Sequence, residues 1–326
     1  MKIRWQFGIV AAILLAIFCL YPQFKMVYLR GDAWNGHYAY NDIDEVAYAS
    51  YVRALIDGRP RKNDPYSGRD DSTASPQLES LFSIQFAAPY TIAVPARIFG
   101  IGPPWAMTIA GALAGFLAAL AGFWLIARMT GSNWFGMAGS ISVFAGGALY
   151  AGEGAALEVF FDGFSYPYFP GFRRYIPALA MTAIFALFAC VWKILEADDD
   201  GDDPTIGRSP AGFDLRIVFA ALAVLCFAYT AFSYFYIWTT AAAWFGCLFL
   251  IWIVERPERW RRDVKVLTAI GGGFGLVLIP YAYLLSKRSD TLDHVQLLVY
   301  TRAPDLFRVP EYIAFFVLLI LIAGIA

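Results

Sequence analysis

The chain has 326 residues with a formal net charge of −1, and 59% of them are hydrophobic while 16% are charged. Soluble domains carry about 25% charged residues, so the composition excludes an ordinary soluble protein. The near-zero net charge also excludes the strongly basic field of a nucleic-acid-binding protein, so no nucleic acid is expected among its partners.

Long apolar runs separated by polar segments predict an all-α integral membrane protein. A helix needs about 20 apolar residues to cross the hydrocarbon core, and these runs are too continuous for the alternating strands of a barrel. The predicted polytopic bundle has about seven or eight transmembrane helices. In chain order, the predicted spans are 7–21, 105–127, 134–150, 176–192, 217–236, 239–254, 266–285 and 312–326.

The first run follows Lys2 and Arg4 and has no small-residue cleavage pattern after it, so it predicts a retained span rather than a signal peptide. A long polar segment comes next. Its apolar stretch 81–100 contains Gln85, two prolines and Arg97, and it fits either a surface helix or a poor span. The last run, 312–326, is short for a span. We expect a single transmembrane domain over 1–326, truncated at its C-terminus, with further helices or a soluble domain missing.

The positive-inside rule favours the reading in which residues 81–100 do not cross the membrane. The basic residues then share one side: Lys2, Arg4, Arg128, Lys193, Arg208, Arg216, Arg256, Arg259, Arg261, Arg262 and Lys265. The predicted outer loops are about 22–104, 151–175 and 286–311. We therefore expect a multi-pass protein of the plasma membrane, the inner membrane of a bacterium, with its active site facing the periplasm or exterior.

Carboxylates gather in the first outer loop, where Asp42, Asp44 and Glu45 precede a short helix predicted over 49–58. Its apolar residues fall largely on one face, which predicts a helix lying flat on the bilayer with that face down. Carboxylates favour helix N-termini, so a capping role for Asp42 or Asp44 is one reading. Basic residues lie within and after this helix and are expected to meet lipid headgroups: Arg53, Arg59, Arg61 and Lys62.

The string Asp44-Glu45-Val46-Ala47-Tyr48-Ala49, with its helix ending at Asp57-Gly58, resembles the first outer loop of the GT-C glycosyltransferases. These are polytopic enzymes that use polyprenyl-phosphate sugars, and the string is similar to the one in lipid A aminoarabinose transferases and protein O-mannosyltransferases. The resemblance covers about the first 130 residues in order of features. A Pro-Pro pair of several relatives is replaced here by Ser75-Pro76-Gln77, which leaves the subfamily and the sugar open.

The resemblance implies a GT-C-like fold and a role for each carboxylate. Asp44 would be the general base on the acceptor, with Glu45 as its support, because sugar transfer passes through an oxocarbenium-like state. Asp42 and Asp44 could instead hold a divalent metal such as Mg²⁺ or Mn²⁺. Tyr48 is a candidate substrate contact. The implied partners are a polyprenyl-phosphate-linked sugar donor, the lipid bilayer, and a lipid, glycan or protein acceptor in the cell envelope.

The predicted second outer loop, 151–175, carries Arg173 and Arg174 at the start of the next span. Arginine suits forked recognition of phosphate oxygens, so these are candidates for binding the donor phosphate. Ordinary snorkelling at the interface is the alternative. Glu153 and Asp162 lie among aromatic side chains, which indicates either a second acidic group at a substrate or metal site, or an interfacial aromatic belt.

The sequence thus predicts a membrane glycosyltransferase, and the alternative is a secondary transporter or lipid flippase without glycosyl transfer. Transporters use ionisable residues near the middle of their spans, and the predicted spans have almost none. A non-enzymatic assembly subunit is a third reading. Gly111 and Gly115 fit a GxxxG motif, which in an apolar span predicts helix packing. The cysteines, which lie singly in apolar runs, predict neither a disulfide nor a zinc site.

Overall fold

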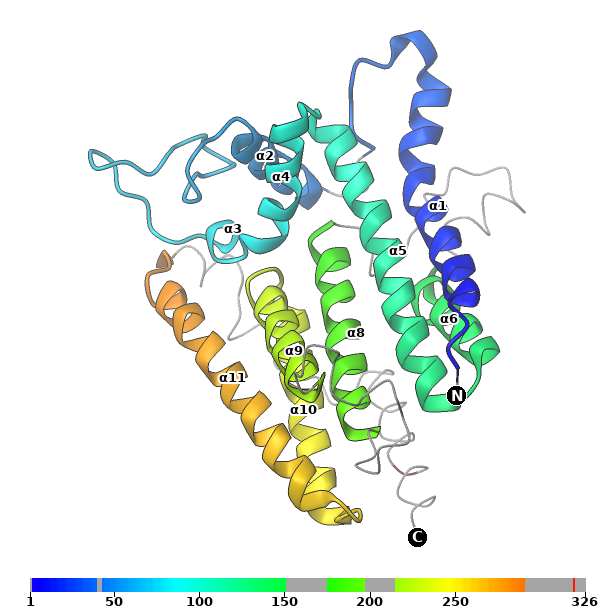
Figure 1. Cartoon of the computed structure of the whole chain (residues 1–326). Coiled ribbons are helices and arrows are strands. Elements are labelled where there is room, and N and C mark those ends of the chain that lie inside the picture. The colour runs from blue at the N-terminus through cyan, green and yellow to red at the C-terminus, as the bar shows by residue number, and fades with distance from the viewer. Residues whose placement is uncertain (1, 40–42, 151–174, 197–214, 291–318, 320–326) are drawn as a thin grey trace. The chain divides into compact units, whose positions relative to one another are not determined.

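The computed structural model describes residues 2–39, 43–150, 175–196, 215–290 and 319. The chain divides into two compact units, Met1–Lys287 and Arg288–Ala326. In the described part of the first unit, the regular elements are all helices (Figure 1). Most of the predicted loop 286–311 and of the predicted span 312–326 falls outside the described residues.

Five helices of the described residues are long and apolar enough to cross a membrane. Helices α6 and α9, with 18 and 17 residues, are shorter. The structure therefore confirms a helical, multi-pass membrane protein, while the count of seven or eight spans stays a prediction. The helices of membrane-like length are α1 (Trp5–Arg30), α5 (Pro103–Thr130), α6 (Asn133–Tyr150), α8 (Tyr175–Glu196), α9 (Leu215–Ala231), α10 (Phe235–Glu255) and α11 (Trp260–Ser286).

Helix α1 is longer than its apolar run, because Pro22 does not end it and the helix continues to Arg30. A proline is tolerated in a helix of this kind where neighbouring groups compensate for the missing backbone hydrogen bond. The extra turns are held from outside: the Gln23 side chain bonds the backbone of His37 and Ala39, at 3.0 and 2.9 Å. Helix α1 therefore extends about two helical turns into the predicted outer loop, whose start at the membrane surface stays a prediction.

The helices of the bundle run in alternating directions (Figure 1). At one end of the α1–α5 pair, Trp5 lies with its ring centroid 6.0 Å from that of Phe123. At the other end, Phe24 lies 6.0 Å from Trp105. Between them, small residues such as Ala12, Ala114 and Ala118 are fully buried. Small residues let membrane helices approach closely, where dispersion replaces the hydrophobic effect as the source of stability.

Replacing Gly115 with Val is expected to lower the unfolding temperature in detergent, whereas Gly111→Val is not. A Cβ at Gly115 would lie 2.8 Å from Cys19 Sγ and 3.6 Å from the Leu15 carbonyl oxygen, while a Cβ at Gly111 meets nothing within 4 Å. Overpacking of this kind costs about 1–3 kcal/mol. Both changes carry the same helix-propensity penalty, so equal loss of stability in the two variants would contradict this packing.

The described part of the predicted first outer loop contains three short α-helices: α2 (Ile43–Ile56), α3 (Leu81–Ile84) and α4 (Ala87–Phe99). The ambiguous stretch 81–100 thus becomes two helices of 4 and 13 residues. At about 1.5 Å per residue, the longer one falls well short of the roughly 30 Å hydrocarbon core. Its geometry agrees with the reading in which this stretch does not cross the membrane.

The apolar face of α2 packs against protein rather than against lipid. Tyr51 and Val52 are fully buried in a cluster with Phe82 of α3 and Ile92 of α4, whereas Val46 is exposed. The expectation that this face lies down on the bilayer is therefore wrong. Helix α4 supplies the complementary apolar surface. Packing α2 on α4 removes the apolar faces of both helices from water, and this burial stabilises the layer.

The α2–α4 layer lies at one end of the bundle, and the start of α1 and the turn between α10 and α11 lie at the other (Figure 1). The end away from the layer holds the start of α1, where the backbone N–H of Arg4 donates to Asn133 at the start of α6 (2.9 Å). It also holds an ion pair between Arg128 and Glu196 at the ends of α5 and α8 (2.6 Å). The turn between α10 and α11 adds further cations there: Arg256, Arg259, Arg261 and Arg262.

Candidate functional site

The acidic pair of the first outer loop lies in the first turn of α2. The helix begins at Ile43, six residues before the predicted start, so Asp44 and Glu45 belong to the helix and do not precede it. Carboxylates in a first turn are favoured by the positive end of the helix dipole. Glu45 is only 3% exposed, so its side chain is buried in the layer, whereas the next residue, Val46, is exposed.

Tyr48 lies one turn further along α2 and is 7% exposed. Its ring meets the Phe82 ring edge-on, with centroids 5.3 Å apart, and Tyr51 contacts the same phenyl group at 5.6 Å. Edge-to-face pairs of this kind stabilise a core beyond their buried area. Tyr48 therefore fixes α2 on α3, and its role as a substrate contact stays a prediction.

The other predicted site residues fall outside the described residues: Asp42, Glu153, Asp162, Arg173 and Arg174. Among the residues that are described, no group of three or more His, Cys, Asp or Glu side chains could hold a metal ion. The predicted divalent metal at Asp42 and Asp44 thus stays a prediction. Because Arg173 and Arg174 lie outside the described residues, their position relative to Asp44 stays a prediction.

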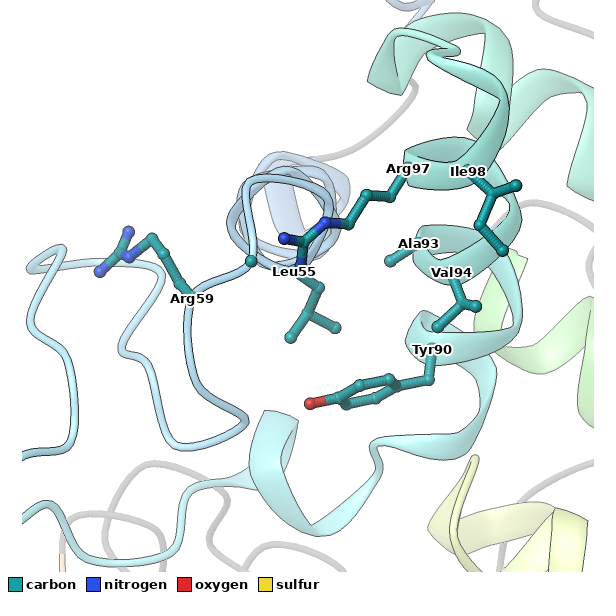
Figure 2. A pocket seen from close by; sticks show the side chains of 8 residues that line it. Leu55, Arg59, Tyr90, Ala93, Val94, Arg97 and Ile98 are labelled. Carbon is teal, nitrogen blue, oxygen red and sulfur yellow. The ribbon is translucent and has the colours of Figure 1, made fainter.

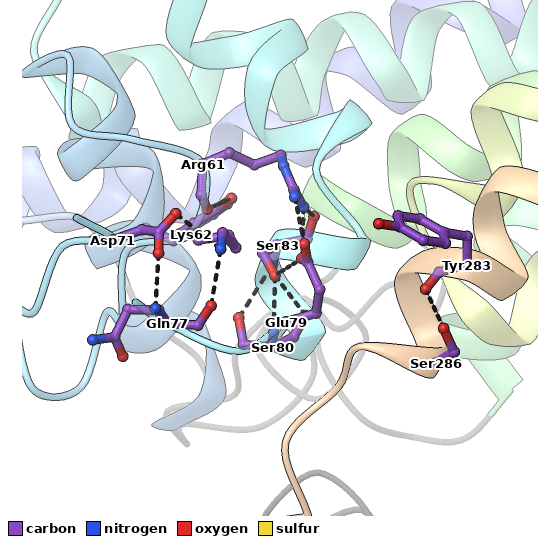
Figure 3. A network of polar contacts seen from close by, with 10 residues as sticks. Arg61, Lys62, Asp71, Gln77, Glu79, Ser80, Ser83, Tyr283 and Ser286 are labelled. Atoms are coloured by element: carbon purple, nitrogen blue, oxygen red, sulfur yellow. Dashed lines mark hydrogen bonds and ion pairs between the residues drawn. The ribbon is translucent and has the colours of Figure 1, made fainter. Parts of the chain in front are cut away.

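A polar network connects the segment after α2 to the start of α3 (Figure 3). The Arg61 guanidinium donates to both carboxylate oxygens of Glu79, at 2.8 and 2.6 Å, and to the Ser83 carbonyl oxygen. The Ser83 hydroxyl donates to the same carboxylate at 2.6 Å, and Ser80 and Ser83 form a capping box at α3. The Arg61 guanidinium also lies over the Phe86 ring, 5.7 Å from its centroid.

A second part of the network involves Lys62. Its ammonium group lies 2.9 Å from an Asp71 carboxylate oxygen and donates to the Gln77 carbonyl oxygen at 2.9 Å. Asp71 in turn accepts from the Gln77 backbone N–H at 2.7 Å. Arg61 and Lys62 were expected to meet lipid headgroups. The structure instead pairs both with carboxylates in the same loop, so they order the loop.

Glu79 is the electrostatic centre of this network. Burial alone would raise the pKa of its carboxyl, but the hydrogen bonds from Arg61 and Ser83 and the nearby positive charges outweigh burial and hold the pKa below its ordinary value. The Glu79 hydrogen bond in turn raises the pKa of the Arg61 guanidinium. Burial raises the pKa of Tyr51, whose hydroxyl donates to the Arg61 carbonyl oxygen at 2.7 Å.

The pH dependence of stability should follow from Glu79. Its folded-state pKa lies below the ordinary value of 4.5, so the ionised carboxylate stabilises the fold above that pH, and the contribution is lost as the pH falls through the folded-state pKa. We expect the wild-type unfolding temperature to fall more steeply on acidification than that of Glu79→Gln. Thermal unfolding in detergent over a pH series measures this, and parallel profiles for the two proteins would contradict it.

The layer is attached to the bundle at two places far away in the sequence. The Ala87 backbone N–H donates to the Phe232 carbonyl oxygen (2.9 Å), and the Thr91 and Tyr229 hydroxyls are 2.9 Å apart. The Glu79 backbone N–H donates to the Lys287 carbonyl oxygen at 3.0 Å. The layer is thus fixed on the α9–α10 turn and on the end of α11.

A cavity of about 360 Å³ lies between the end of α2 and the outer part of α4 (Figure 2). Helix α2 ends in a Schellman motif, with Gly58 at φ +86° and the Arg59 N–H bonded to the Ala54 carbonyl oxygen (2.9 Å). The Arg97 guanidinium lies over this end: a Cβ at Gly58 would be 2.6 Å from its Nη1. The lining residues are Leu55, Gly58, Arg59, Tyr90, Ala93, Val94, Arg97 and Ile98.

The sequence did not single out this cavity. In the sequence, Arg97 is a charge that interrupts an apolar stretch, and Gly58 marks the end of a predicted helix. The sequence signal for the cavity is the presence of both this arginine and this glycine. A cation on one short helix and a glycine at the end of another come together only once the helices pack.

No family model, no curated protein and no solved structure matches the chain. The fold and its apolar helices define the class as a helical multi-pass membrane protein. Within that class, the resemblance of the Asp44-Glu45 string to the GT-C glycosyltransferases stays a prediction, and it is carried by the residues alone.

Proposed function

We propose that this protein is a GT-C-like membrane glycosyltransferase, which moves a sugar from a polyprenyl-phosphate donor to a lipid, glycan or protein acceptor. The observation that carries the proposal is the placement of the acidic first turn of α2. Asp44 and Glu45 lie in a helix that is packed into an ordered layer, at the end of the bundle away from the start of α1 and the α10–α11 turn. A rigid element suits a carboxylate that must meet a reacting atom.

In the proposed reaction, Asp44 takes the proton of the acceptor hydroxyl or amine while that group attacks the sugar anomeric carbon. The bond between this carbon and the phosphate oxygen breaks, and the polyprenyl phosphate leaves with the electron pair. Attack on the face opposite the leaving group inverts the anomeric centre. Arg173 and Arg174 would stabilise the charge that develops on the leaving phosphate.

The charge distribution supports an outer position for this site. The basic residues at the far end of the bundle are those that the positive-inside rule assigns to the cytoplasm. The α2–α4 layer then faces the periplasm or exterior, at the depth of the headgroups. A lipid-linked donor presents its phosphate and sugar at that depth.

The charges of the bundle argue against a secondary transporter. In the part of the chain that the structure describes, the central turns of α1, α5, α6, α8, α9, α10 and α11 contain no Asp, Glu, Lys or Arg. Transporters place ionisable groups near the middle of the membrane, where they bind the coupling ion. The charges here lie at helix ends and in the α2–α4 layer, where an enzyme that acts on substrates at the membrane surface needs them.

Native mass spectrometry of the purified protein with polyprenyl phosphate tests the proposal. Wild type and Asp44→Asn are expected to bind the lipid, because the base does not hold the donor phosphate. Arg173→Ala/Arg174→Ala is expected to bind it poorly. If none of the three proteins binds polyprenyl phosphate, the glycosyltransferase proposal fails and transport becomes the function to test.

A further inference from the structure

The cavity between α2 and α4 contains a cation whose charge the layer does not neutralise. Among the described residues, the Arg97 side chain has no hydrogen bond or ion pair. Four neighbouring cations differ from it in having carboxylate partners: Arg53 with Asp57, Arg59 with Asp70, Arg61 with Glu79, and Lys62 with Asp71. The exposed Arg97 is thus available for a ligand.

The groups around Arg97 suit a phosphate. Figure 2 shows the Tyr90 hydroxyl and the Leu55 side chain facing the space below the Arg97 guanidinium, while the Arg59 guanidinium turns away from it. Arg59 donates to Asp70 at 2.8 Å and to the Gly68 carbonyl oxygen at 2.5 Å, so its charge is already used. Arginine presents a planar fork that matches two phosphate oxygens, and a phenol adds a third donor.

The apolar wall of the cavity is open on its outer side. Val94 and Ile98, one turn apart on α4, are 48% and 72% exposed, and Phe99 is 75% exposed. Leu55 and Ala93 form the buried inner part. A ligand bound here would have its polar end beside Arg97 and its apolar part along the outer face of α4.

The cavity is close along the chain to a helix of membrane-spanning length. Helix α4 ends at Phe99, and the long apolar helix α5 begins only four residues later at Pro103. Arg97 would then lie near headgroup depth, beside the start of a span. Basic side chains at this depth attract anionic lipids by about 1 kcal/mol each.

We infer that this cavity binds the phosphate headgroup of an anionic membrane phospholipid. The Arg97 guanidinium donates to two phosphate oxygens and the Tyr90 hydroxyl to another, and one acyl chain lies along Val94 and Ile98. The exposed wall favours a bulk phospholipid, because its chains remain in the surrounding bilayer. The inference does not depend on glycosyl transfer and uses none of the residues proposed for it.

A structural role for Arg97 would give a different result. A cation over the end of α2 complements the negative end of the helix dipole, which stabilises the helix by about 0.3–1 kcal/mol with or without lipid. Loss of that role lowers the unfolding temperature in lipid-free detergent. Loss of a lipid site instead removes the increase in unfolding temperature that the added lipid produces.

Native mass spectrometry and thermal unfolding of the full chain with phosphatidylglycerol, phosphatidylcholine and polyprenyl phosphate test the inference. We expect the wild type to prefer phosphatidylglycerol over phosphatidylcholine, and Arg97→Ala to lose that preference by about tenfold or more. Arg97→Lys should retain part of it, since an ammonium is a point charge without the fork. Arg53→Ala makes the same charge change elsewhere on the layer and should bind as the wild type does.

Two results would overturn the inference. In the first, Arg97→Ala keeps the wild-type preference for phosphatidylglycerol, whether or not its unfolding temperature in lipid-free detergent falls. In the second, Arg97→Ala loses binding of polyprenyl phosphate but keeps binding of phosphatidylglycerol. The first outcome assigns Arg97 to the helix end only, and the second assigns the cavity to a polyprenyl lipid.

Discussion

Replacing Asp44 with Asn is expected to reduce sugar transfer by about 100-fold or more, because the amide keeps the shape of the side chain but cannot accept a proton. General bases contribute about 10²–10⁴-fold to such reactions. The measurement is the rate of sugar transfer from a polyprenyl-phosphate donor by protein in detergent or vesicles, with donor binding measured in parallel. Binding should be retained, so the loss falls on the chemical step.

The control for this variant lies just after the end of the same helix. Asp57 follows the last residue of α2 and pairs with Arg53 at 2.8 Å, with 45% of its side chain exposed. Asp57→Asn removes one carboxylate from the same layer and should leave transfer unchanged. Full activity of Asp44→Asn would exclude Asp44 as the general base, and equal losses in both variants would point to a general effect on the layer. The assembly-subunit reading instead predicts that the wild type transfers no sugar.

Arg61→Met is expected to lower the free energy of unfolding of the α2–α4 layer by about 2–3 kcal/mol, because it leaves the Glu79 carboxylate buried without its cation. Breaking a fully buried pair costs roughly 3–5 kcal/mol, and the value here is smaller because the Arg61 side chain is 28% exposed. Thermal unfolding in detergent, together with the rate of proteolytic cleavage in the loop 57–80, measures the effect.

A double-mutant comparison separates the pair from its surroundings. Arg61→Met/Glu79→Gln should be more stable than Arg61→Met alone, since the uncompensated charge is then removed. Arg53→Met breaks a pair whose side chains are 61% and 45% exposed, so it should cost less than about 1 kcal/mol. If Arg53→Met and Arg61→Met destabilise the protein equally, the Arg61–Glu79 pair contributes no more to stability than an exposed pair does.

Apolar run length predicted most of the bundle. The runs 105–127 and 239–254 lie within α5 and α10. A long apolar segment in lipid forms a helix because its backbone N–H and C=O groups must bond to one another. The errors are at the polar ends of the runs. Helix α1 continues past Pro22, where the Gln23 side chain bonds the backbone of His37 and Ala39, and α2 begins at Ile43 rather than at residue 49.

The candidate site was predicted less completely, for a different reason. The acidic string around Asp44 was recognisable because its residues are adjacent in sequence. The Arg61–Glu79 pair joins residues in an irregular loop, where no helical or strand spacing indicates which charges meet. The same holds for the burial of α2: periodicity identified its apolar face, but it could not say whether lipid or α4 covers that face.

The two distant attachments of the α2–α4 layer have a consequence for biogenesis. The layer is made early in synthesis, yet the hydrogen bonds of Ala87 and Glu79 end on Phe232 and Lys287. Those partners leave the ribosome only after α9 and α11 have been made. The α2–α4 layer therefore completes these attachments only after α11 has been made, although its own residues are synthesised early. A nascent chain halted before Phe232 would carry the acidic first turn of α2 on a layer that is still unattached, and truncations tested for activity should retain α11.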